Sequence, residues 1–299
     1  MKMNPVYKRE MMVSARSLRM SLIITVFNSI LAVVALLNMY SNVVQVRITA
    51  DVQYGSFLDL YEFVACVEFI MLMFIMPAIT SGTISGERER QTLDLMLTTK
   101  MKSWEIVTGK LAAAFVTMFL VVISSFPVIA MVFVYGGITW GNVAQMMACY
   151  VVSALFAGSL GICCSSLFKR STVATVAAYA VLALTVAGTF AVNMFSYSMA
   201  RMDLNTAAYA MGNMGGVTVN SGGFLYTLLV NPAVTFLVIL QKNAPASTTG
   251  ILQSYGSREP GLVMNHWVLV SMAVQLALSA LFFLIAVKTV RKKGIGRNA

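Results

Sequence analysis

Residues 81–110, SGTISGERERQTLDLMLTTKMKSWEIVTGK, form a dense polar island in a chain that is otherwise strongly apolar. The island holds nine charged side chains, namely Glu87, Arg88, Glu89, Arg90, Asp94, Lys100, Lys102, Glu105 and Lys110. Apolar stretches long enough to cross a bilayer lie on both sides of it. A short charged segment between two such stretches lies outside the lipid, where a partner protein can bind it.

The composition of the chain predicts a membrane protein. Of the 299 residues, 59% are hydrophobic and 11% are charged, and the mean hydropathy is +0.80. A soluble domain carries about 25% charged residues. A protein core cannot bury this much apolar surface, so lipid must cover it. We therefore expect a polytopic membrane protein.

Six stretches are long enough to cross the bilayer as helices, because about 20 apolar residues span its hydrocarbon core. These predicted spans are residues 20–40, 58–80, 109–135, 143–168, 172–195 and 267–288. Residues 224–240 are also apolar, but Asn231-Pro232 interrupts them. Proline lacks an N–H and pushes the preceding residue away from helical angles, so two half-helices that re-enter the same side are expected. The predicted fold is all-α with six spans in a single domain.

The positions of lysine and arginine predict how the chain is oriented. With six spans and the N-terminus inside, 17 basic residues face the cytoplasm, and four face outside. We therefore expect an interfacial helix over 1–19, the 81–108 loop and the 289–299 tail in the cytoplasm, and an extracytoplasmic segment over 196–266. Basic span ends meet anionic lipid headgroups at about 1 kcal/mol each, which explains the net charge of +10 without nucleic acid.

The island itself is predicted to form a short amphipathic helix parallel to the membrane. Gly82 and Gly86 loosen the backbone after the second span, so that a new helix can leave the membrane axis. Helical spacing over 87–97 places the apolar side chains on one side, while Arg90 and Asp94, four residues apart, can pair on another.

The residues GERERQTLDLMLTT at 86–99, followed by SWEIVTGKL at 103–111, resemble the cytoplasmic loop of ABC-2-type transporter permeases. These permeases are the membrane subunits of exporters driven by a partner ATPase. The match covers positions 84–111 well, and the six-span layout and the interrupted NPA segment extend it loosely over the chain. Two positions depart from the family pattern: Gln91 stands where a glycine is common, and Lys100 stands where a proline is common.

The resemblance implies that the loop between the second and third spans carries the coupling helix, which docks on the nucleotide-binding subunit. The docking residues that it implies are Gly86, Glu87, Arg88, Glu89 and Arg90, with Leu93, Leu95 and Leu97 as adjoining apolar contacts. The alternative is that the charges only anchor a cytoplasmic loop.

The chain is not expected to be an enzyme, and no catalytic residue is predicted. Residues 108–111, TGKL, contain the Gly-Lys pair of a phosphate-binding loop but lack its first glycine and its hydroxyl. ATP and magnesium are therefore expected on a separate cytoplasmic ABC ATPase subunit, with no cofactor or metal bound directly. An intramembrane protease would need a paired catalytic set at matching depth, which the spans do not offer.

Glu68 is the polar residue near the middle of the second predicted span, where a charge costs about 2.5–3.5 kcal/mol. One hypothesis makes it a pathway residue that contacts a polar substrate or cation. The other makes it a protonated or hydrogen-bonded structural glutamate. The residues alone leave both open.

The resemblance and the spans together predict a multi-pass permease subunit for ATP-driven export across the plasma membrane, with both termini cytoplasmic. Because six spans offer half of the usual pathway, a homodimer or a pair with a sister permease is expected, surrounded by membrane lipids. The alternative function is a non-transporting membrane anchor or sensor subunit of an ATPase complex.

Overall fold

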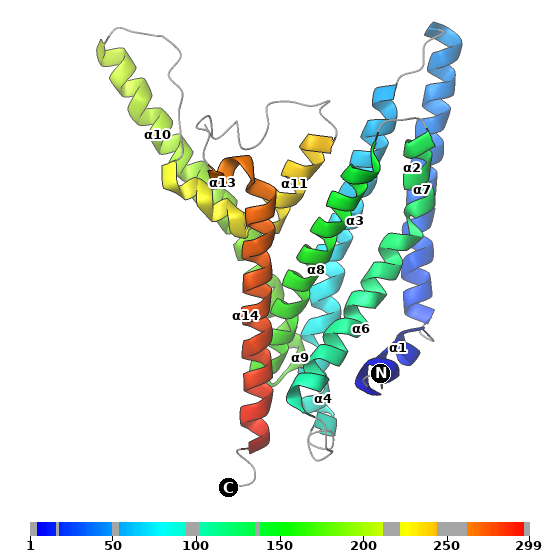
Figure 1. Ribbon diagram of the computed structural model, residues 1–299, viewed down its shortest axis with the longest axis vertical. Coiled ribbons are helices and arrows are strands. Elements are labelled where there is room, and N and C mark those ends of the chain that lie inside the picture. The colour runs from blue at the N-terminus through cyan, green and yellow to red at the C-terminus, as the bar shows by residue number, and fades with distance from the viewer. Residues whose placement is uncertain are drawn as a thin grey trace. The chain divides into compact units, whose positions relative to one another are not determined.

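The computed structural model describes residues 5–15, 18–49, 54–93, 102–134, 138–211, 222–243 and 262–295. Within these ranges all regular structure is helical and no strand occurs, which confirms the predicted all-α class (Figure 1). The chain divides into two units. The first comprises Met1–Tyr179 and Leu278–Ala299, and the second comprises Ala180–Ala277.

Six helical segments of the described chain are long and apolar enough to cross a membrane, which confirms the predicted number of spans. They are Ser21–Gln45, Leu58–Glu89, Ser103–Ala130, Trp140–Leu167, Ser171–Leu204 and Trp267–Arg291. The helices extend beyond the apolar stretches, because a helix continues as long as its backbone angles allow and does not stop where hydropathy falls. The fifth segment shows this most clearly, since its helix runs on to Met211.

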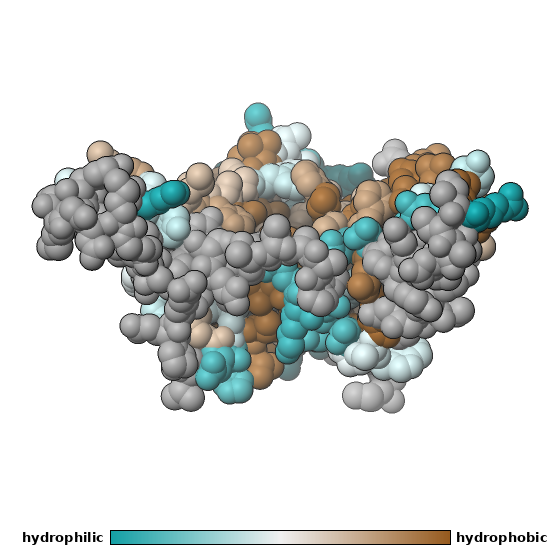
Figure 2. All heavy atoms as spheres, turned by 90° about the horizontal axis from the view of Figure 1, so that it is seen from above, coloured by the Kyte–Doolittle hydropathy of each residue, from teal (hydrophilic) through white to brown (hydrophobic). Residues whose placement is uncertain are grey.

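Many large apolar side chains of the described residues are exposed, and Figure 2 shows hydrophobic patches beside hydrophilic ones on the face seen from above. On the longest helix the exposed apolar side chains include Leu22, Ile30, Leu36 and Leu37. A soluble protein would bury such side chains. The exposed surface therefore suits lipid, as the composition predicts.

The first unit is a bundle in which α3, α6 and α8 lie side by side (Figure 1). Its complete helices are α1 (Pro5–Ala15), α2 (Leu18–Thr49), α3 (Tyr54–Ser81), α4 (Thr83–Glu89), α6 (Ser103–Ser124), α7 (Phe126–Val134) and α8 (Trp140–Leu167). Most of α9 (Ser171–Ala183) and the last part of α14 (Trp267–Ile295) also belong to it. Helix α1 lies within the predicted interfacial segment and packs on α6.

Two glycines let α8 approach α3 closely. A Cβ atom at Gly161 would lie 2.0 Å from Thr80 Oγ1, and one at Gly158 would lie 2.7 Å from Met76 Cε. Both distances are far below van der Waals contact, so only glycine fits at these positions without a shift. The close approach brings the end of α3, and the segment that follows it, against the C-terminal part of α8.

The second unit contains the interrupted apolar segment. After the π-helix η1 (Leu184–Gly188) and α10 (Thr189–Met211), the 3₁₀-helix η2 (Gly222–Val230) and α11 (Pro232–Asn243) meet at an angle of 95°, and α13 (Leu262–Asn265) follows. The bend lies at Asn231-Pro232, where the sequence predicts a break. A sharply bent pair of this kind has the geometry expected for two half-helices.

The Asn231 side chain holds this bend. Its Oδ1 accepts from Ala233 N (2.9 Å), which caps the start of α11. Its Nδ2 donates to Val186 O (3.0 Å) and to Thr189 Oγ1 (2.8 Å). Because a π-helix displaces its carbonyl groups from the regular helical pattern, Val186 O can accept a bond from outside the helix.

Candidate functional site: the charged elbow between α3 and α6

The charged segment after α3 forms an elbow, and we use the name charged elbow for residues 82–93. It contains α4, a turn at Arg90 and Gln91, and then Thr92 and Leu93, which are helical again. The helix expected over 87–97 is therefore interrupted by this turn. The turn is made by Gln91, whose φ of 56° lies in the left-handed region. Glycine adopts this conformation without steric cost, which gives a physical reason for the glycine common at this position in the family pattern. Residues 94–101, including the predicted contacts Leu95 and Leu97, lie outside the described ranges.

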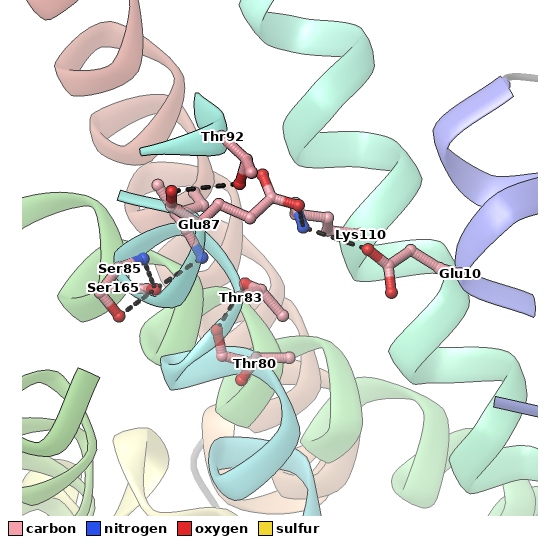
Figure 3. A network of polar contacts seen from close by, with 9 residues as sticks. Glu10, Thr80, Thr83, Ser85, Glu87, Thr92, Lys110 and Ser165 are labelled. Carbon is pink, nitrogen blue, oxygen red and sulfur yellow. Dashed lines mark hydrogen bonds and ion pairs between the residues drawn. The ribbon is translucent and has the colours of Figure 1, made fainter. Parts of the chain in front are cut away.

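Helix α4 begins with a cap supplied by another helix. Its own cap residue is Gly82, which has no side chain to accept the free N–H groups. Instead Ser165 Oγ on α8 accepts from Ile84 N and Ser85 N, both at 3.0 Å, and lies 3.1 Å from Ser85 Oγ (Figure 3). These bonds fix the start of the charged elbow on α8.

Glu87 joins the charged elbow to α6 and, through a lysine, to α1. Lys110 Nζ donates to Glu87 Oε1 at 2.8 Å and to Glu10 Oε1 at 3.2 Å (Figure 3). Lys110 is only 3% exposed, so its charge depends on these two carboxylates, because a buried unpaired ammonium is strongly unfavourable. The ion triad therefore connects α4 and α6 to α1, which is about 100 residues from α6 in the sequence.

Arg88 joins the charged elbow to the end of α8. Its Nη1 donates to Phe168 O at 2.8 Å and its Nη2 donates to Ser166 O at 3.2 Å. The last carbonyl groups of a helix have no partner within the helix and carry partial negative charge. The guanidinium group satisfies two carbonyl groups there and complements the helix dipole.

Glu89 joins the charged elbow to the start of α9. Its Oε1 accepts from Ser171 N and its Oε2 accepts from Ser171 Oγ, both at 2.8 Å. A carboxylate at a helix N-terminus accepts an N–H that has no partner within the helix and interacts favourably with the dipole. Hydrogen bonding also lowers the free energy of the ionised carboxylate, so Glu89 is held as an anion at this position.

The predicted docking residues therefore have different environments. Gly86 lies within α4, and a Cβ atom there would meet nothing within 4 Å. Arg90 is exposed, as expected for a residue that meets a partner. Leu93 differs from the expectation, because it is 5% exposed and packs with Ile84, Val107, Ile162 and other core residues of the first unit.

Sequence reasoning did not identify the residues that bond to the charged elbow from other parts of the chain. Glu10, Lys110, Ser165 and Ser171 complete the site from four different elements. Lys110 carried no distinct signal, because a lysine at a span end is already expected from the anionic lipid headgroups. The two serines carried none, because serine is common at helix ends.

Glu68 lies elsewhere in the first unit, on the interior face of α3. It is 1% exposed, and its Oε1 is in hydrogen-bonding contact with Ser125 Oγ, between α6 and α7. It lines a small cavity together with Tyr61, Ala65, Ile129, Val143, Met146, Met147 and Tyr150. Among the described residues, no group of three or more His, Cys, Asp and Glu side chains is placed to hold a metal ion.

Comparison with known proteins gives one finding on the family. A search of curated protein sequences finds no match to the chain. A family model described as an ABC-2 family transporter protein matches residues 14–288, which include the charged elbow and every helix from α2 to α13. The chain therefore belongs to the ABC-2 family and is a multi-pass membrane component of a transporter.

Proposed function

We propose that this chain is the permease subunit of an exporter in the plasma membrane and that a separate ABC ATPase drives it through the charged elbow. The family supports a transporter role, and the excess of basic residues on one predicted side supports a cytoplasmic elbow. ATP and magnesium bind the partner subunit in this proposal, and two permease chains together form the pathway.

One observation carries the proposal. Three consecutive side chains of the charged elbow, Glu87, Arg88 and Glu89, bond to different elements of the first unit. Their bonds reach α6, the end of α8 and the start of α9, and Lys110 extends the first of them to α1. A force applied to the elbow would therefore act on several helices at once, as a coupling element requires.

The tip of the charged elbow contains Arg90 and Gln91, both of which are exposed, and Glu89 is exposed as well but bonds to Ser171. The side chains of Glu87, Arg88 and Glu89 already bond to other helices of the chain. They are therefore suited to transmitting force to those helices rather than to binding a partner. We therefore assign docking on the ATPase to the tip and transmission to the three residues before it. Leu95 and Leu97, which lie outside the described residues, remain proposed apolar contacts of the ATPase.

A docking test must change the tip without disturbing the internal bonds. Arg90→Glu reverses an exposed charge, and Arg201→Glu is the matched control, because Arg201 is an exposed arginine on α10 in the other unit. The candidate ATPase is co-purified with each full-length variant. We expect wild type and Arg201→Glu to retain the ATPase and Arg90→Glu to lose at least tenfold in affinity, about 1.4 kcal/mol.

The outcomes separate the proposal from its rivals. If wild type retains no ATPase, the chain is not a permease of this kind. If Arg90→Glu binds as well as the control, docking lies elsewhere. A complex that forms normally but never stimulates hydrolysis would favour the alternative, a non-transporting anchor or sensor subunit of an ATPase complex.

A further inference from the structure

Glu68 lies among helices that offer it no counter-charge. Helix α3 contains no lysine or arginine, and α7 and α8 contain no charged residue of either sign. The lysine of α6 is Lys110, which pairs with Glu87 and Glu10. The arginines of α2, Arg19 and Arg47, lie at its two ends. An ionised Glu68 would therefore be an isolated buried charge, which costs far more than a neutral acid.

The other titratable groups around Glu68 supply no positive charge either. On its own helix they are Asp59, Glu62, Tyr61 and Cys66, and on α8 they are Cys149 and Tyr150. All of these groups are neutral or negative, so none stabilises a carboxylate by its charge. The Tyr150 hydroxyl donates to Ala65 O at 3.0 Å. The hydroxyl of Tyr150 has a single proton, so while it donates to Ala65 O it cannot also donate to Glu68.

The hydrogen bonds of Ser125 indicate where a proton lies. Its Oγ is in contact both with Glu68 Oε1 and with Val122 O, the latter at 2.7 Å. Both neighbours would be acceptors if Glu68 were ionised, and a serine hydroxyl has only one proton to donate. If Glu68 is protonated, its O–H donates to Ser125 Oγ, and Ser125 donates to Val122 O. Each donor then has one acceptor.

Ser125 is also the residue at which the third span breaks. Its N–H bonds to Val122 O (3.3 Å) at the end of α6, and its carbonyl accepts from Val128 N (2.9 Å) at the start of α7. A bond from α3 to this residue fixes the position of the break. We propose that Glu68 carries a proton at neutral pH and donates it to Ser125, so that a neutral carboxylic acid holds α3 to the α6–α7 break. This inference is independent of the proposed export.

The test is an infrared spectrum of the full-length protein in lipid nanodiscs, taken for wild type and Glu68→Gln. We expect the carbonyl band of a protonated carboxylic acid in wild type at neutral and mildly alkaline pH, and its absence from Glu68→Gln. Glu62→Gln, on the same helix, is the matched control and should keep the band. In Ser125→Ala the band should persist and move to higher frequency, because the acid loses its acceptor.

Two results would overturn the proposal. One is a wild-type spectrum with no acid band, or a difference spectrum with Glu68→Gln that shows carboxylate bands. The other comes from thermal unfolding, where Glu68→Gln should keep the wild-type Tm because the amide is neutral and donates a hydrogen bond. Glu68→Ala should lower Tm by several degrees. If Glu68→Gln is as unstable as Glu68→Ala, a neutral hydrogen-bond donor at position 68 does not stabilise the protein, and the proposal is wrong.

Discussion

The conformation of a single residue, Gln91, sets where the charged elbow turns. Its φ of 56° is one that residues with a side chain seldom adopt and that glycine adopts freely. The sequence identifies Gln91 as a departure from the family pattern, but only the backbone shows the cost of that departure. Gln91 therefore carries backbone strain that a glycine at this position would not.

Replacing Gln91 should change stability in opposite directions for two substitutions. Gln91→Gly is expected to raise the free energy of unfolding by about 1 kcal/mol, because it removes the left-handed penalty. Gln91→Val should lower it by about 1 kcal/mol, since a β-branched side chain tolerates positive φ least. Thermal unfolding in detergent measures both, and equal Tm values for the two variants would contradict the assignment.

Lys110 is the residue on which the ion triad depends. Lys110→Met removes the only cation in the triad and leaves Glu87 and Glu10 without it, so a loss of about 3 kcal/mol in unfolding free energy is expected. Adding Glu87→Gln should recover part of that loss, because one of the two carboxylates is then neutral. Lys102→Met, at an exposed site, is the control and should stay within about 0.5 kcal/mol. A similar loss in both single variants would argue against the triad.

At the scale of elements, the contact between α3 and α8 positions the charged elbow. Gly161→Ala would place a Cβ atom 2.0 Å from Thr80 Oγ1, and Thr80 is held by its own bond to Met76 O at 2.7 Å. We expect a loss of about 1–3 kcal/mol from overpacking. Gly141→Ala on the same helix has its nearest contact at 3.8 Å and should be close to neutral.

A double variant checks whether the loss comes from this contact. Thr80→Ala removes the nearest atom, so Thr80→Ala with Gly161→Ala should be less destabilised than the sum of the two single variants. The measurement is unfolding of all four proteins under the same conditions. Strict additivity would show that Gly161 acts through some other neighbour.

The elements themselves were largely predictable, whereas the contacts between their ends were not. Hydropathy predicts six spans, and Asn231-Pro232 predicts the break between η2 and α11. The sequence could not show that Ser165 caps α4 or that Glu89 caps α9, because these pairs are about 80 residues apart and a serine has many uses. Leu93 likewise has the spacing of a surface ridge, yet it packs inward.

At the scale of the whole molecule, the family and the membrane class follow from sequence pattern, and the coupling path follows from the structure. The matched family covers residues 14–288. The bonds of the charged elbow all lie within the first unit. For Glu68 the sequence leaves a pathway role and a structural role open, and the hydrogen bonds of Ser125 favour the structural one.

The central claim is that the charged elbow transmits force from an ATPase to the helices, and Glu89→Ala tests it most directly. This change removes the bonds from the elbow to α9 and leaves those of Glu87 and Arg88 in place. ATP hydrolysis by the purified complex is compared with hydrolysis by the isolated ATPase, with Asp203→Ala, an exposed acid on α10, as the control. We expect Glu89→Ala to bind the ATPase normally and to lose most of the stimulation, while the control keeps it. Wild-type stimulation in Glu89→Ala would contradict the account.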